Sequence, residues 1–117
     1  MALPNVERIN VETRHLNHWS KTLNASAAQS AVELQAAPGA GKHLVLTDVA
    51  ISSLSAQTTK LLGGATDIYE IVYTGINGNH VNNMTTGIDL ASNVALDVTS
   101  TAAVAHSVTV SGYTEVD

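Results

Sequence analysis

The first feature that could do chemistry is the glycine-rich segment Gly39-Ala40-Gly41-Lys42. Such a loop can hold a phosphate group when a helix follows and points its backbone amides at the ligand. The phosphate-binding loop also requires a glycine where this chain has Ala36, and serine or threonine where it has His43. Because neither requirement is met, we interpret the segment as a β-turn, in which Pro38 fixes one backbone angle and glycine supplies left-handed conformations.

His15 and His18 form the only close pair of histidines in the sequence. On a helix they would share one face and could chelate a metal ion, whereas on a strand they would point to opposite sides. A metal site would need further ligands. We therefore interpret both as solvent or interface histidines and predict no metal site.

Asp and Asn side chains near turns are the next candidates, because loop carboxylates and carboxamides can bind calcium. Asp67, Asp89, Asn93 and Asp97 do not have the spacing of a calcium loop, and turn formation explains them. No serine stands in a recognisable nucleophile elbow. We predict no catalytic residues and no cofactor, and hence a protein that is not an enzyme.

The composition indicates one domain with an aliphatic core and a weakly charged surface. Of 117 residues, 44% are hydrophobic but only 3% are aromatic, so Val, Leu, Ile and Ala must fill the core. Charged residues make up 13%, about half the usual share of roughly 25%. The formal net charge of −5 argues against nucleic acid or an anionic membrane as a partner. No cysteine is present, which excludes disulfides and thiolate sites.

The charge is distributed unevenly along the chain. Residues 1–24 carry three basic and two acidic residues, whereas the remainder carries two basic and eight acidic ones. The first segment also contains the only tryptophan, and an aromatic beside Arg and His is typical of an interface anchor. We expect residues 1–24 to form an extended N-terminal arm that contacts a partner through Arg8, Arg14, His15, His18, Trp19 and Lys21. Two alternatives remain open: Trp19 covers one end of the domain, or the segment is disordered.

Residues 25–117 are expected to form the folded domain, in which short strands alternate with polar turns. The stretch 43–53 is apolar on both alternating faces, with Leu44, Leu46 and Ala50 on one side. This pattern predicts a strand covered on both sides. Residues 25–37 are ambiguous: their composition favours a helix, but residues 31–35 alternate as in a strand. The turn that follows favours the strand.

Further strands are predicted at 58–62, 68–74 and 80–84, followed by a loop over 85–93. The strands at 94–100 and 104–115 are expected to pair as a final hairpin. Tyr69, Ile71 and Tyr73 share one strand face, which indicates packing against the core or against another subunit. About eight short strands separated by turn signals predict an all-β antiparallel sandwich.

Four segments of the chain resemble the jelly-roll capsid decoration (cement) proteins of tailed bacteriophages. They are the turn Ala37–Lys42 leading into Leu44–Thr47, Ala56–Thr59, Gly87–Ala91 and Thr109–Val116. The resemblance covers roughly residues 30–116 and implies an antiparallel jelly-roll β-sandwich. Residues before 25 have no counterpart in it.

The resemblance also implies a function. A decoration protein stands on the outer surface of the virion head, is made in the host cytoplasm and stabilises the shell. Its partners would be subunits of the major capsid protein and further copies of itself, in a homotrimer. Related jelly rolls occur in tail and fibre components, so a receptor- or glycan-binding module is the alternative.

Overall fold

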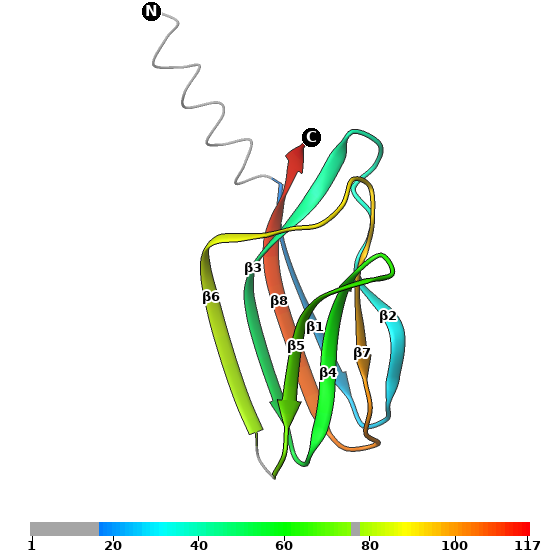
Figure 1. Cartoon of the computed structure of the whole chain (residues 1–117), viewed down its shortest axis with the longest axis vertical. Helices are drawn as coiled ribbons and strands as arrows, with labels where there is room; N and C mark the ends of the chain where they lie inside the picture. The colour runs from blue at the N-terminus through cyan, green and yellow to red at the C-terminus, as the bar shows by residue number, and fades with distance from the viewer. Residues whose placement is uncertain (1–16, 76–77) are drawn as a thin grey trace, which may run out of the picture.

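The computed structural model describes residues 17–75 and 78–117. All regular elements in these ranges are strands, and the ranges contain no helix that could span a membrane. Figure 1 shows the strands packed as a sandwich of two sheets. They are β1 (His18–Ala25), β2 (Gln29–Gln35), β3 (Lys42–Ser53), β4 (Gln57–Gly63), β5 (Thr66–Tyr73), β6 (Gly78–Asp89), β7 (Leu96–Ser100) and β8 (His106–Val116).

The strand order confirms the predicted jelly roll. One four-stranded antiparallel sheet has the order β1-β8-β3-β6, and the other has the order β2-β7-β4-β5. The pairs nest, with β1 on β8, β2 on β7, β3 on β6 and β4 on β5. Nested pairing arises when one long antiparallel ribbon is rolled into two facing sheets, which is the jelly-roll architecture.

The central strand β3 changes its buried face halfway along. Leu44 and Leu46 lie in the core, and a register shift between Leu46 and Asp48 then adds one residue. After this bulge the alternation is reversed, so Ile51 also lies in the core. The predicted grouping of Ala50 with Leu44 is therefore wrong, because Ala50 lies on the outer side.

The space between the sheets is filled by aliphatic side chains, as the composition predicted. Half-buried Tyr69, Ile71 and Tyr73 of β5 pack against this core, and the Tyr73 hydroxyl donates a hydrogen bond to the Ile51 carbonyl at 2.7 Å. The largest fully buried side chains are Leu44, Leu46, Ile51, Leu61, Leu96, Val45, Val49, Val98, Val108, Val110 and Thr59.

Trp19 belongs to this core, where only 7% of its surface is exposed. It pairs across β1 and β8 with Gly112, whose missing side chain leaves room for the indole ring. A Cβ at Gly112 would lie 2.7 Å from that ring and 1.9 Å from the carbonyl oxygen of Val45. Residues 18–24, predicted to belong to the arm, are instead part of β1. The folded domain thus begins before residue 25, and the alternative in which Trp19 covers one end matches its burial.

The structure decides three further predictions about the strands. The ambiguous segment forms strand β2. The predicted final hairpin is wrong, because β7 and β8 lie in different sheets and residues 101–105 cross between them. β6 continues through most of the predicted loop and ends at Asp89. Residues 84–87 of β6 stand opposite the single residue Thr47 of β3 before Ile88 pairs with Leu46, and Gly87, with φ of 75°, allows the backbone to make this irregular turn of the register.

We predict that Gly112→Ala lowers the free energy of unfolding by about 2–3 kcal/mol, because the added methyl group overpacks the Trp19 contact. Gly75→Ala is the matched control, since no atom lies within 4 Å of its added Cβ. Urea unfolding followed by the fluorescence of the single tryptophan measures both variants. Equal midpoints for the two would contradict the close packing at Gly112.

Candidate interaction surfaces

The structure separates the residues predicted to contact a partner. Arg8, Arg14 and His15 lie outside the described residues, whereas His18 and Lys21 are exposed on β1. His18 lies on the outer side of the sheet, while Lys21 shares the inner side with buried Trp19 at the sheet edge. The described members of the set therefore do not form one surface.

The glycine-rich segment forms the turn between β2 and β3, as predicted. Gly39 and Gly41 have φ values of 108° and 79°, and the Lys42 amide donates to the Gly39 carbonyl at 3.3 Å. Strand β3 follows the turn. The arrangement therefore lacks the helix N-terminus that a phosphate-binding loop uses.

The acidic and amide side chains that the sequence places near turns do not come together in one site. Asp67 forms an ion pair with Lys60 at 3.3 Å, and the Asn93 side-chain oxygen accepts a hydrogen bond from the Gly39 amide at 2.9 Å. Asp89 and Asp97 lie on different sheets. Within the described ranges, no group of three or more His, Asp or Glu side chains could hold a metal ion.

A polar cluster that the sequence did not suggest joins the end of β8 to the start of β3. His43 Nδ1 lies 2.7 Å from Asp117 Oδ1, and Ser92 Oγ donates to Asp117 Oδ2 at 2.5 Å. The hydrogen bond from Ser92, followed by that with His43, lowers the pKa of Asp117. In a catalytic triad the histidine accepts the hydrogen bond of the serine, whereas here Ser92 is hydrogen-bonded to Asp117. The cluster therefore does not have the geometry of a triad. The cluster holds the end of β8 against the start of β3. No pattern in the sequence indicates this contact, because His43 and Asp117 are 74 positions apart.

The outer side of the β1-β8-β3-β6 sheet carries charge at one end, where a row across all four strands contains His18, Tyr113, Val45 and Asp89, and Glu115 lies beyond it. The rest of this side, towards Ser53 of β3 and Gly78 of β6, is almost free of charge. The register aligns the side chains of this second part in three rows across all four strands. Asp48 is the only charged residue among them, and no side chain is longer than asparagine. We call these residues the outer face: Ser20, Ser111, Asp48 and Asn83; Thr22, Thr109, Ala50 and Val81; Asn24, Ser107, Ser52 and Asn79.

Hydrogen bonds within the outer face satisfy several of its polar groups. Asp48 Oδ2 accepts hydrogen bonds from Ser111 Oγ and Thr47 Oγ1, both at 2.9 Å. The hydroxyls of Thr22 and Thr109 lie 3.1 Å apart. Short side chains also lose less entropy when they are buried than Lys, Arg or Glu, which lose about 1.5–2 kcal/mol each. The outer face is therefore suited to packing against another surface.

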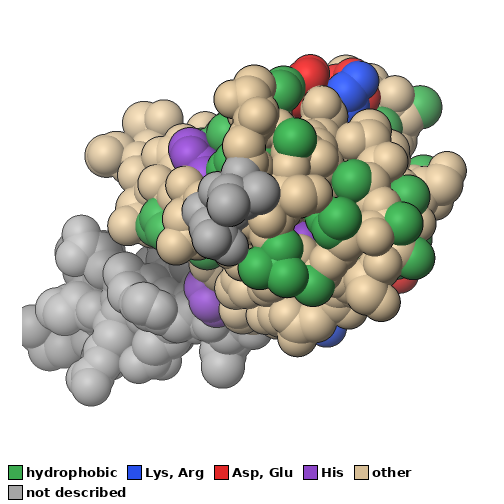
Figure 2. All heavy atoms as spheres, turned by 90° about the horizontal axis from the view of Figure 1, so that it is seen from below, with side chains coloured by type: hydrophobic (Ala, Val, Ile, Leu, Met, Phe, Trp, Pro, Cys, Tyr) green, Lys and Arg blue, Asp and Glu red, His purple; other side chains and the backbone are tan. Residues whose placement is uncertain are grey.

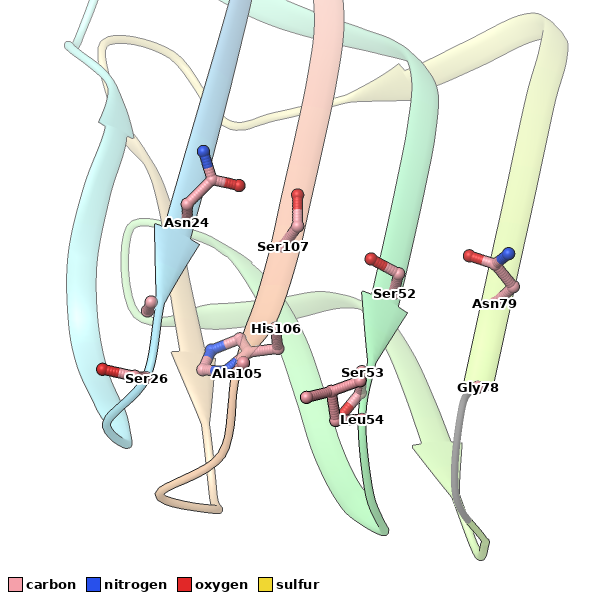
Figure 3. Close-up of a pocket in the computed structure, with 11 residues that line it drawn as sticks. Asn24, Ser26, Ser52, Ser53, Leu54, Gly78, Asn79, Ala105, His106 and Ser107 are labelled. Atoms are coloured by element: carbon pink, nitrogen blue, oxygen red, sulfur yellow. The ribbon is translucent and has the colours of Figure 1, made fainter.

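The last row of the outer face borders a shallow hollow of about 650 Å³. Figure 3 shows its four residues, Asn24, Ser107, Ser52 and Asn79, one on each strand of the sheet. Below them lies buried His106, whose Nδ1 donates to the Val104 carbonyl at 2.7 Å and whose Nε2 accepts from Ser100 Oγ at 2.9 Å. Amide and hydroxyl groups thus line a hollow without a charged side chain.

The hollow also includes part of the loop end, which we define as residues 26–28, 54–56, 74–75 and 101–105. None of these residues is charged, and most are Ala, Val or Leu. Figure 2 views this end and shows hydrophobic side chains across it, with acidic and basic side chains at its margins. Leu54 is 57% exposed here.

The outer side of the other sheet has the opposite character. Glu33 stands directly opposite Asp97, and Lys60 stands opposite Glu70. Burial, together with the charge of Glu33, raises the pKa of Asp97. We call Glu33, Lys60, Asp67, Glu70 and Asp97 the acidic face. The outer face, which is part of one sheet, is therefore nearly neutral, and the acidic face of the other sheet lies on the opposite side of the sandwich.

No protein-family model and no curated protein sequence matches the chain. Among solved structures, the Tobacco streak virus coat protein aligns with a TM-score of 0.40 and 9% identity, over 83% of this chain and 85% of that one. A chain from Bacillus endospore appendages, which form disulfide-linked pili, gives 0.38 and 13%, over 82% and 86%. The particle of extra small virus from the prawn Macrobrachium rosenbergii gives 0.34 and 12%, over 86% and 80%. These distant similarities assign no function.

Asp97→Asn should stabilise the protein by about 0.5–1 kcal/mol at pH 7, because it removes a like charge directly opposite Glu33. The raised pKa of Asp97 means that folding disfavours its ionised form, so the gain should vanish as the pH falls below the unfolded value of 3.8. Asp67→Asn, which breaks an ion pair, is the control and should give no gain. Urea midpoints at pH 7 and pH 3 measure the effect, and a gain that persists at pH 3 would contradict this assignment.

Proposed function

We propose that the chain is a structural protein of a phage virion, which decorates the outside of the head and stabilises the shell. It would do so by contacting more than one subunit of the major capsid protein, as a homotrimer and without a chemical reaction. The sequence resemblance to decoration proteins supports this role, and the jelly-roll strand order is the fold that the resemblance implies.

The observation that carries the proposal is the nearly neutral outer face. Docking removes water from a surface, and burying an unpaired charge costs several kcal/mol. Asp48, the one charge on this face, already accepts two hydrogen bonds. The outer face would therefore lie against the shell, while the acidic face on the opposite side stays in water.

The N-terminal segment would add basic contacts to this docking. Because residues 18–25 form β1, the arm is now limited to the residues before 18, and it precedes an edge strand of the sheet that carries the outer face. Arg8, Arg14 and His15 belong to this shorter segment. Weak contacts from the arm and the outer face, repeated over several copies, would add through avidity.

The hollow favours one second candidate, a receptor- or glycan-binding module of a tail or fibre. Its amide and hydroxyl groups, from Asn24, Ser52, Asn79 and Ser107, match the neutral hydroxyls of a sugar. This candidate predicts binding to host glycans and no saturable binding to heads.

The outer face is tested by co-sedimentation of the protein with heads stripped of decoration. Thr109→Lys places a long charged side chain in the centre of the outer face and should weaken binding at least tenfold. Thr58→Lys, at a half-buried threonine on the outer side of the other sheet, should bind like the unchanged protein. Absence of saturable binding by the unchanged protein would overturn the decoration role, and equal losses in both variants would overturn the assigned face.

The arm is tested in the full chain, since truncation at residue 25 would delete β1 together with Trp19. The double variant Arg8→Glu and Arg14→Glu should bind heads several-fold more weakly, with a larger loss at low salt because the contacts are electrostatic. Its unfolding midpoint should match that of the unchanged protein. Unaltered head binding at low salt would remove the arm from the mechanism.

A further inference from the structure

The four strands at the sheet edges differ in how they are protected. An edge strand exposes unpaired backbone groups, and proteins block such edges with charges, proline or bulges. The edges here are β1, β6, β2 and β5. β1 carries Lys21 and β5 carries Asp67 and Glu70, while β2 has two register shifts and a positive φ of 46° at Ala31.

The first half of β6 has none of these protections. From Gly78 to Asn83 it pairs with β3 without a register shift, and it contains no proline and no Asp, Glu, Lys or Arg. Val81 lies in the middle of this stretch with 68% of its surface exposed. Asn79 and Asn83 flank it on the same side of the sheet and are also exposed. We call residues 78–83 the open edge.

Contacts on the inner side hold the open edge in place. The Tyr69 hydroxyl is hydrogen-bonded to His80, and the side-chain amide of Asn82 donates to the same hydroxyl at 3.1 Å. With β3 on one side and Tyr69 beneath, the strand is held extended. A partner strand would thus bind a preformed edge and would not have to order it.

We propose that the open edges of two copies pair with each other, antiparallel, across a two-fold axis. This contact would join the β1-β8-β3-β6 sheets of both copies into one continuous sheet. An antiparallel pair of identical strands is self-complementary, and it would place Val81 near the partner subunit's Val81.

Charge favours a second copy of this chain at the open edge. Each copy has a formal net charge of −5, so contact between two copies meets the least repulsion where acidic side chains are absent. The open edge is uncharged, and the nearest row of the outer face contains Thr22, Thr109 and Ala50 beside Val81. The acidic face belongs to the other sheet. The joint therefore buries apolar and backbone groups without bringing carboxylates together.

This contact goes beyond the proposed function and is independent of heads. A two-fold contact also differs from the three-fold contact of a homotrimer. The open edge alone gives dimers, and the two contacts together give assemblies with an even number of copies.

The absence of cysteine makes a cross-linking test direct. Val81→Cys in the full chain, under mild oxidation at low protein concentration, should form at least ten times more disulfide-linked dimer than Val72→Cys. Val72 is the matched control, because it is also an exposed edge-strand valine, at 57%, but lies on the edge that carries Asp67 and Glu70. Equal cross-linking of both variants would overturn the proposal.

Sedimentation of the protein without introduced cysteine provides the second measurement. The unchanged chain should have the mass of an even number of copies, and Val81→Lys should halve that number while the circular dichroism spectrum is retained. A monomer or a trimer, unchanged by Val81→Lys, would overturn the proposal. It would indicate that the open edge is vacant or is covered by another segment, such as residues 1–16. Because no heads are present, this result does not depend on the decoration role.

Discussion

The contact between Trp19 and Gly112 holds strand β1 in the β1-β8-β3-β6 sheet, and the outer face depends on the position of this strand. Trp19 is the only buried side chain of β1, and half-buried Leu23 is the other hydrophobic side chain of this strand that packs against the core. The packing of this edge strand, which pairs with β8 along its whole length, therefore depends mainly on the indole ring. β8 lies between β1 and β3, and Gly112 lets the ring fit where a side chain would collide with it and with the β3 backbone. β1 also supplies one strand of the outer face. The candidate docking surface therefore depends on a core contact.

The strands and the sandwich could be predicted because their signals are local. Alternating apolar residues and the Pro-Gly turn suffice to place β3 within one residue. The errors arose where long-range contacts decide. Nothing near Trp19 in the sequence indicates that Gly112 leaves space for it, so an aromatic beside basic residues suggested an anchor. Likewise, two neighbouring strands suggest a hairpin unless it is known that β7 and β8 belong to different sheets.

The candidate surfaces were less predictable than the fold. Composition indicated a surface poor in charge, but it could not show how the few charges are divided between the sheets. The outer face combines β1 and β8, from opposite ends of the described chain, and only the register aligns its rows. A one-residue shift would move every side chain of a strand to the other side. The bulge at Leu46–Asp48 makes such a shift within β3, which is why strict alternation misplaced Ala50.

The uneven distribution of charge makes one side of the sandwich easier to cover than the other. Association removes water from a surface, so the face with the fewest charges loses the least hydration free energy when it is covered. The acidic face gains most from staying hydrated, because Glu33 and Asp97 already repel each other in water. If the proposed docking is correct, many such domains on one shell would turn their acidic faces outward, where like charges keep neighbouring particles apart. A nearly neutral docking surface and a hydrated acidic face would thus follow from one arrangement, in which short polar side chains form the outer face and Glu33, Asp67, Glu70 and Asp97 lie on the opposite sheet.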